Sequence, residues 1–250
     1  MNIVIVGYGN VGKEIERKIR LKELDDRVYT IDVNPKMNAE FLDIDEFNRR
    51  EYTAEVYIVC VWSQKQVLDV IKKIKLDNKP LISIETTCPP GTYEIAKNMV
   101  KDKAYLIVFP ERRVVNDDFH SVFNHPRVMG GDYEQGREFY LRYMLWENII
   151  PTDNPELAEL CKIVENAYRY ITIAIAEELR MLIPKHFEEL RYLMNTKWNI
   201  DLPEARDGIK GICLPKDIKL FNEYFKENKM FKLAEKINED YNERYQNIHD

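Results

Sequence analysis

Short apolar runs alternate with segments of helical spacing through the first 110 residues. The apolar runs predict strands at 3–6, 27–32, 56–61, 81–85 and 105–109. Between them, apolar residues recur every three to four positions and predict helices at 11–24, 63–74 and 92–100. Strands that alternate with helices imply parallel pairing through right-handed crossovers. We therefore expect an α/β domain built on a doubly wound parallel sheet over residues 1–150.

The pattern changes after residue 150, where a long helix is predicted. Asn154 is a capping residue, Pro155 suits the first helical position, and no breaker follows until Pro184. The predicted helix, residues 155–183, is about 40 Å long at 1.5 Å per residue. Further helices are predicted at 186–196 and 219–245. We expect an all-helical second domain over residues 151–250. The long helix needs a partner surface because it carries a wide apolar stripe: Leu160, Val164, Ile171, Ile175 and Leu179.

A glycine-rich turn joins the first predicted strand to the first predicted helix. Its residues are Gly7, Gly9, Asn10, Val11 and Gly12, and strand, turn and helix together favour dinucleotide binding. The helix N-terminus there would face the pyrophosphate. Asp32 ends the second strand, 20 residues beyond Gly12, where its carboxylate can accept both ribose hydroxyls and repel a 2′-phosphate. The sequence therefore predicts a Rossmann domain that binds NAD; a turn that has lost its cofactor is the alternative.

Charge and cysteine content narrow the possible partners. The net charge of −6 and the scattered Lys and Arg argue against nucleic-acid binding. The most apolar stretch, 170–183, is too short and too charged to span a bilayer. The four cysteines show no metal-binding or disulfide spacing, so we expect reduced thiols, no metal site and a cytoplasmic protein.

One cysteine stands among residues suited to covalent catalysis. The Cys213 thiol could attack an aldehyde, and loss of a second hydride would give a thioester that water hydrolyses. Lys162 and Asn166, four residues apart on one helix face, suit the stabilisation of an oxyanion. Asp217 could orient water or accept a proton. Taken singly, Lys162 would more often be a solvated lysine, and Cys213 a small buried apolar residue.

Several motifs, in the same order along the chain, resemble those of the UDP-glucose, UDP-N-acetylmannosamine and GDP-mannose dehydrogenases. They are Thr87-Cys88-Pro89-Pro90-Gly91-Thr92, Pro110-Glu111-Arg112, Pro126-Arg127-Val128-Met129-Gly130-Gly131, the helix segment 159–169, Cys213-Leu214-Pro215-Lys216-Asp217, and Ala234-Glu235-Lys236-Ile237-Asn238. The resemblance implies an NAD-dependent enzyme that oxidises the primary alcohol of a nucleotide sugar to a carboxylate. The second and third motifs lean toward the N-acetylmannosamine branch.

The resemblance also implies roles for individual residues. Cys213 would be the nucleophile, with Lys162 and Asn166 holding the oxyanion and Asp217 the catalytic water. Thr87 would position that water beside the nicotinamide, and Glu111 would be the base for thioester hydrolysis. Ser63, Thr87 and Lys216 would line the cofactor. The helix at 155–183 would form the core of a homodimer.

The sequence departs from the family pattern around the nucleophile. Lys210 stands where the family has a glycine, and Ile212 where it has a histidine. The segment before Gly208 is shorter than in the family, and the chain ends near where the family's third, substrate-covering domain would begin. A separate chain could supply that domain. Two alternatives therefore stay open: a non-catalytic NAD-binding or assembly protein, and a β-hydroxyacid dehydrogenase-like oxidoreductase that needs no thiol and yields one NADH.

Overall fold

The computed structural model describes residues 1–50, 52–112 and 121–246 of the chain. It divides into two compact units, residues 1–162 and residues 163–250. Each unit is described by itself below.

The first unit is built on a mostly parallel sheet. In the described residues the sheet has seven strands in the order β2-β1-β3-β4-β5-β6-β7. The first five are parallel to their neighbours, which confirms the α/β prediction. β6 runs antiparallel to β5, and β7 pairs in parallel with β6. The strands are β1 (Asn2–Val6), β2 (Arg27–Ile31), β3 (Val56–Val59), β4 (Leu81–Ile84), β5 (Tyr105–Val108), β6 (Arg127–Gly131) and β7 (Ile149–Thr152).

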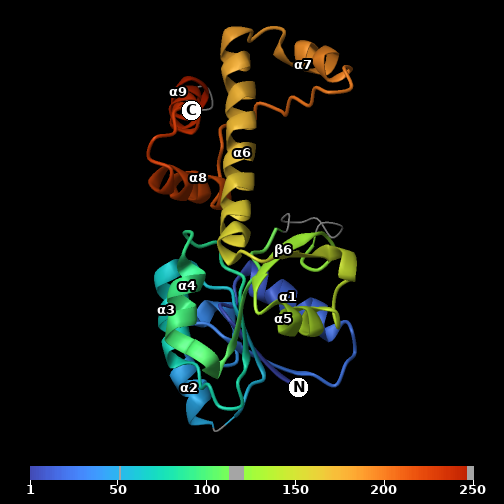
Figure 1. The fold of residues 1–250 in the computed structure, drawn as a ribbon. Coiled ribbons are helices and arrows are strands. Elements are labelled where there is room, and N and C mark those ends of the chain that lie inside the picture. The colour runs from blue at the N-terminus through green and yellow to red at the C-terminus, as the bar shows by residue number, and fades with distance from the viewer. Residues whose placement is uncertain (51, 113–120, 247–250) are drawn as a thin grey trace. The chain divides into compact units, whose positions relative to one another are not determined.

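Helices cover both faces of this sheet (Figure 1). An apolar cluster lies on each face of the sheet. Because side chains alternate along a strand, Val4 and Val6 of β1 belong to the first cluster, and Ile3 and Ile5 belong to the second. The first face is covered by α2 (Ile44–Arg49), α3 (Gln64–Lys73) and α4 (Thr92–Val100), and the second by α1 (Asn10–Arg20) and α5 (Tyr133–Tyr140). Because both faces are buried, the central strands are continuous apolar runs.

The predicted helix at 11–24 is shorter in the structure. α1 ends at Arg20, and the chain turns through Glu23, which has a positive φ of 50°. Leu21 and Leu24, whose spacing led to the prediction of a longer helix, are exposed. Residues 21–24 therefore form the connection to β2, and the pattern alone overstated the helix.

Helices are the regular secondary structure of the second unit in its described residues. It contains most of α6 (Pro155–Leu182), together with α7 (Phe187–Asn195), α8 (Cys213–Tyr224) and α9 (Met230–Gln246). One apolar cluster joins α6 to α8 and α9, and a second joins α6 to α7 and α9. Figure 1 shows α8 and α9 packed along one side of α6 within this unit.

The prediction of one helix over 219–245 was wrong, because the chain turns between α8 and α9. α8 ends at Tyr224, and α9 begins at Met230. Asn228 explains the break: its Oδ1 accepts from the Lys232 backbone N–H at 3.2 Å, and its amide donates to Asn222 at 2.8 Å. An asparagine that caps the next helix in this way competes with helix continuation.

None of the helices in the described ranges is long and apolar enough to cross a membrane.

Glu177 is a carboxyl group inside the helical unit. It lies on α6, is fully buried, and neither of its carboxylate oxygens has a hydrogen-bond partner among the described residues. Burial raises the pKa of Glu177 from 4.5 to about 7. The folded protein therefore holds this proton more tightly than the unfolded chain does.

We expect Glu177→Gln to remove a pH dependence of stability. Between pH 4.5 and 7 the native state binds more protons at this site than the unfolded state, so the free energy of unfolding falls as pH rises. The full loss is about 3 kcal/mol, from about 1.4 kcal/mol per pKa unit. Urea unfolding at pH 5 and pH 8 should show the variant to be more stable than wild type at pH 8 only. The exposed neighbour Glu178→Gln should match wild type at both pH values; equal gains in both variants would contradict this account.

Candidate functional site

The glycine turn at the end of β1 adopts a geometry that only glycine allows. Gly7 has a φ of +94°, and a Cβ there would lie 2.6 Å from the Cys60 carbonyl. A Cβ at Gly12 would lie 2.2 Å from the Gly7 oxygen, so α1 packs closely on the turn. At Gly9, by contrast, a Cβ would meet nothing within 4 Å. Gly9 thus leaves open space at the N-terminus of α1, which begins at Asn10, as a bound pyrophosphate requires.

Asp32 is fixed at the adjacent strand end by backbone donors. Its Oδ2 accepts from the Tyr8 N–H at 2.8 Å, and its Oδ1 accepts from the Asn34 N–H at 2.8 Å. The carboxylate is thereby held between the glycine turn and the loop after β2. A carboxylate in this position can accept hydroxyl protons from a ribose.

A pocket of about 520 Å³ opens beside Asp32. Its walls come from the glycine turn, residues 31–34 after β2, the start of α2, residues 60–62 after β3, and one face of α3. Its volume and mostly apolar lining fit the adenosine half of a dinucleotide. Trp62, which follows β3, lines this pocket.

Ser63 and Thr87 follow two neighbouring strands. Ser63 caps α3 by accepting from the Gln66 N–H. Thr87 lies half-buried in the turn after β4. Its neighbour Thr86 donates to the Val61 carbonyl at 2.8 Å, which ties this turn to the loop after β3. Both residues therefore lie at the carboxyl edge of the sheet, where ligands of such folds bind.

The turn after β4 is also held by Glu159, a residue that the sequence reasoning missed. Glu159 lies on α6, and its carboxylate accepts from the Gly91 and Tyr93 N–H groups, each at 2.7 Å. Burial raises the pKa of Glu159 to about 7. The contact caps α4 and fixes the turn that carries Thr87. An acid early in a long helix was the only signal in the sequence.

Glu111 belongs to a buried cluster of charges. Arg127, fully buried, pairs with Glu85 and, at 3.2 Å, with Glu111, while its guanidinium lies 3.8 Å from the Phe109 ring centroid. His125 Nε2 lies 3.6 Å from Glu111 Oε1, and burial lowers the pKa of His125. Burial raises the pKa of Glu85. Two carboxylates thus share one guanidinium, and Glu111, predicted as a base, is held in place by it.

In the second unit, Cys213 is the first residue of α8 and is exposed, unlike a core cysteine. Asp217 lies one turn further along the same helix face and is buried. Its Oδ2 accepts from the Asn166 amide at 2.5 Å, and Lys216 Nζ lies 3.4 Å from its Oδ1. The structure thus gathers Cys213, Asp217, Lys216 and Asn166.

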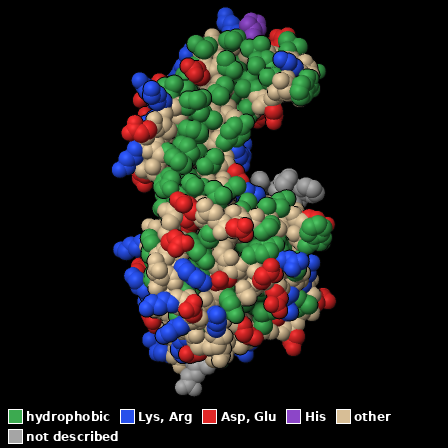
Figure 2. Space-filling model, in the orientation of Figure 1, with side chains coloured by type: hydrophobic (Ala, Val, Ile, Leu, Met, Phe, Trp, Pro, Cys, Tyr) green, Lys and Arg blue, Asp and Glu red, His purple; other side chains and the backbone are tan. Residues whose placement is uncertain are grey.

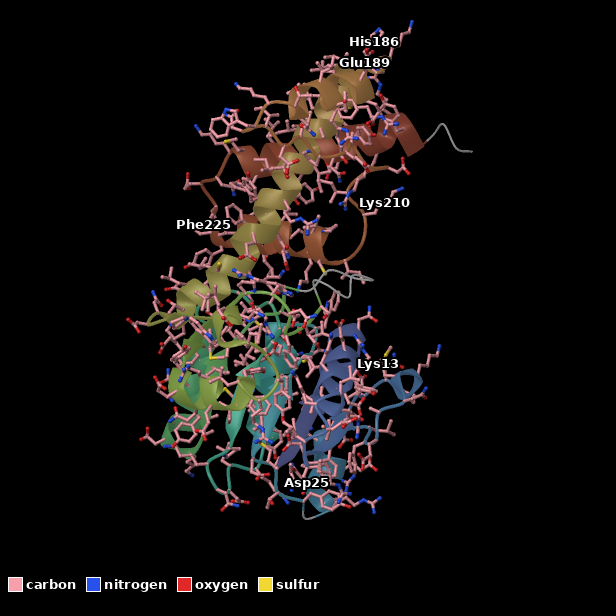
Figure 3. The ribbon with its side chains drawn as sticks, turned by 90° about the vertical axis from the view of Figure 1, so that its right-hand side faces the viewer. Lys13, Asp25, His186, Glu189, Lys210 and Phe225 are labelled. Atoms are coloured by element: carbon pink, nitrogen blue, oxygen red, sulfur yellow. The ribbon has the colours of Figure 1, made fainter. Side chains whose placement is uncertain are left out.

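Two further residues of the sequence prediction are placed by their elements. Lys162 lies one turn before Asn166 on α6 and is the last residue of the first unit. Lys210, on the loop before α8, is exposed, and Figure 3 labels it on that loop. Gly211 has a φ of +89°, and a Cβ there would meet nothing within 4 Å, so the loop next to the thiol is open.

The glycine turn, the acid after β2 and the mostly parallel sheet define a Rossmann-type α/β fold. Residues 156–240 match the model of the UDP-glucose/GDP-mannose dehydrogenase family, central domain. The curated UDP-N-acetyl-D-mannosamine dehydrogenase of Methanocaldococcus jannaschii is 28% identical over 264 residues, which cover 95% of this chain and 61% of the relative. The chain is therefore similar to a nucleotide-sugar dehydrogenase along nearly its whole length, which agrees with the resemblance of its motifs.

Solved structures share the fold. The UDP-D-ManNAc dehydrogenase from Pyrococcus horikoshii superposes with a TM-score of 0.79 at 22% identity, covering 96% of this chain and 69% of that one. A Mycobacterium tuberculosis 3-hydroxyisobutyrate dehydrogenase gives 0.73 at 14% identity, covering 98% and 94%. The chain spans about 61% of the M. jannaschii relative's length.

Proposed function

We propose that this protein is an NAD-dependent nucleotide-sugar 6-dehydrogenase of the UDP-N-acetylmannosamine or UDP-glucose type. The observation that carries the proposal is the contact between Asn166 and Asp217, one helical turn from the exposed thiol of Cys213. It supports a site in which the Asn166 amide and the Cys213 thiol, both in the second unit, act together. The names of the curated relatives support a nucleotide sugar as the substrate.

The residues present fit NAD as the cofactor. Gly7, Gly9, Asn10, Val11 and Gly12 would bind the pyrophosphate, with the open space at Gly9 admitting it. Asp32 would bind the ribose and repel a 2′-phosphate, which favours NAD over NADP. Ser63, Thr87 and Lys216 are proposed to line the remainder of the cofactor site. Bound NAD supplies a hydride acceptor, and a second NAD is needed for each substrate.

Cys213 carries the covalent chemistry in this proposal. The first oxidation converts the primary alcohol to an aldehyde. The thiolate then adds to the aldehyde carbon, forming a C–S bond and an oxyanion that Lys162 and Asn166 would stabilise. Loss of a second hydride converts this thiohemiacetal to a thioester. Water then breaks the C–S bond, releasing the carboxylate and restoring the thiol.

Three residues support the hydrolytic step. Thr87 would position the water, and Glu111, held by Arg127, would accept a proton from it. Asp217, proposed as the partner of that water, is buried and bonded to the Asn166 amide. This contact supports an additional role for Asp217, which is to hold the Asn166 amide toward the oxyanion.

A calorimetric binding screen tests the proposed substrate and cofactor. NAD should bind with a Kd at least about tenfold lower than that of NADP, because Asp32 disfavours the added phosphate. UDP-N-acetylmannosamine or UDP-glucose should bind in the presence of NAD, and GDP-mannose more weakly. Binding of NAD with no response to any nucleotide sugar would instead favour the non-catalytic alternative, which the replacements Lys210 and Ile212 around the nucleophile already suggest.

A two-electron oxidoreductase is the second candidate. The similarity to 3-hydroxyisobutyrate dehydrogenase covers nearly the whole of both chains, although at 14% identity it shows the fold alone. Enzymes of that type share the Lys-x-x-x-Asn spacing of Lys162 and Asn166 but need no thiol. They make one NADH per substrate, so the yield of NADH separates the two candidates.

We also propose that the chain forms a homodimer through α6. Large apolar side chains recur on this helix with heptad-like spacing and are exposed: Val164, Tyr168, Ile175 and Leu182, of which Leu182 is 70% exposed. Figure 2 shows apolar side chains gathered along this part of the second unit. Exposed stripes of this kind mark helix–helix interfaces.

Ile175→Glu should convert the dimer to a monomer. The side chain is already exposed in the single chain, so the charge costs little in the monomer but would be buried and unpaired in the dimer. Light scattering after gel filtration should give twice the chain mass for wild type and a single chain mass for the variant. Lys219→Glu, an exposed site on α8, should stay dimeric. A wild-type protein that is monomeric at all concentrations would contradict the proposal.

A further inference from the structure

The pocket beside Asp32 has two apolar walls that face an open slot. Trp62, from the loop after β3, is 57% exposed, and Val33, from the loop after β2, is 75% exposed. Met37 and Val61 complete the lining on these two sides. A protein rarely exposes such large apolar groups on facing loops unless they meet a ligand. A flat aromatic base would cover both walls.

Polar groups line the same pocket at α2 and α3, and most of them are already paired. Lys73 donates to Asp45, and Asp69 accepts from Lys72 at 3.5 Å. Gln66 Oε1 accepts from the Trp62 N–H at 3.0 Å, which leaves the Gln66 amide N–H groups available. Asp43 Oδ1 accepts from the Glu46 N–H at 2.7 Å, while Oδ2 makes no hydrogen bond or ion pair within the described part of the chain. Asp43 Oδ2 and the Gln66 amide are thus an acceptor and a donor that the pocket offers to a ligand.

We propose that Asp43 and Gln66 read the base of the dinucleotide and select adenine. The exocyclic amine of adenine is a donor, and its ring nitrogens are acceptors. Asp43 Oδ2 accepts from the amine, and the Gln66 amide donates to a ring nitrogen. Hypoxanthine carries a carbonyl oxygen in place of the amine, which would face the Asp43 carboxylate and be repelled. This inference rests on the proposed NAD site and adds the residues that choose the base.

Asp43 is held in place before any ligand arrives. It is the N-cap of α2, with an extended backbone, and its bond to the Glu46 N–H fixes the side-chain torsions. Gln66 is fixed in the same way by its bond to Trp62. Each side chain is anchored by one hydrogen bond before the ligand binds. Little side-chain entropy is therefore lost when its remaining polar atoms bind the base.

The test compares NAD with nicotinamide hypoxanthine dinucleotide, which differs only at the base. Calorimetric titration of the full chain should give a Kd for NAD about tenfold lower than for the hypoxanthine analogue. Asp43→Asn keeps the helix cap through its Oδ1, because Asn caps as well as Asp, and turns its amide N–H groups toward the base, where they can donate to the hypoxanthine oxygen but not accept from the adenine amine. We expect this variant to lose the preference for NAD, with the hypoxanthine analogue binding at least as tightly as NAD. Asp43→Ser, also a good cap but too short to reach the base, should weaken NAD binding toward that of the analogue.

A control variant, and two outcomes that separate failure of the NAD site from failure of the Asp43 assignment, complete the design. Asp69→Asn alters an exposed acid of the same pocket that is paired with Lys72, and it should keep the wild-type preference. If wild type binds neither dinucleotide, the proposed NAD site fails, and base selection with it. If wild type binds both equally, or if Asp43→Asn keeps the full preference while Asp69→Asn loses it, the NAD site stands and the assignment to Asp43 is overturned.

Discussion

Cys213→Ser should abolish carboxylate formation while leaving NAD binding intact. Serine is a far weaker nucleophile toward an aldehyde, and an ester oxygen is a poorer leaving group than the thiolate. Removing a covalent nucleophile typically costs on the order of 10³-fold or more in kcat. Cys213 is exposed and begins α8, so its replacement disturbs no core packing. The measurement is the rate of NADH formation with UDP-N-acetylmannosamine, followed beside a calorimetric Kd for NAD.

Cys161→Ser provides a matched control for this variant. Cys161 lies on α6 with its sulfur 3.1 Å from Arg112, and serine can keep that hydrogen bond. Turnover in this control should stay within about twofold of wild type, as is usual when no transition-state contact is lost. A Cys213→Ser protein that retains more than a tenth of wild-type turnover would contradict the role of the thiol.

Arg127→Leu should have the largest effect on stability. The substitution removes the guanidinium that pairs with the buried carboxylates of Glu85 and Glu111. Breaking a buried ion pair on one side typically costs about 3–5 kcal/mol, because here the Glu85 carboxylate stays buried without its counter-charge. Urea unfolding followed by circular dichroism would measure the loss. Arg20→Leu, which breaks the exposed pair with Glu16 on α1, should cost less than about 1 kcal/mol.

A double variant keeps this prediction testable even if Arg127→Leu folds poorly. Adding Glu85→Gln removes the buried negative charge that Arg127 pairs with in wild type, and should recover part of the lost stability. Equal losses in Arg127→Leu and Arg20→Leu would show that the buried cluster contributes nothing beyond a surface pair.

The elements that the sequence predicted well are those whose pattern is local. β1, the glycine turn and the start of α1 follow from an apolar run, three glycines and a helical period. The strand β6 was missed because it contains a buried arginine and two glycines where an apolar run is expected. The arginine, Arg127, is buried because it pairs with Glu85, 42 residues earlier in the chain, and no local sequence pattern contains that contact. β7 was missed for a similar reason, because Pro151 argues against a strand interior.

The candidate site shows the same division between local and distant signals. The spacing of Lys162 and Asn166 on a helix could be read directly from the sequence. The contact between Asn166 and Asp217, 51 residues apart, could be expected only from the family resemblance. Glu159 and Asp43 gave no chemical signal because their roles depend on which backbone N–H groups they meet. The burial of Glu177 also has no signal in the sequence, since Glu usually faces water.

The yield of NADH per carboxylate tests the central claim most directly. The protein is incubated with excess NAD and a limiting amount of UDP-N-acetylmannosamine or UDP-glucose, and the product is identified by mass spectrometry. Oxidation through a Cys213 thioester predicts two NADH for each uronate formed, with no free aldehyde. One NADH per substrate with a carbonyl product, or full turnover in the absence of the Cys213 thiol, would contradict the account.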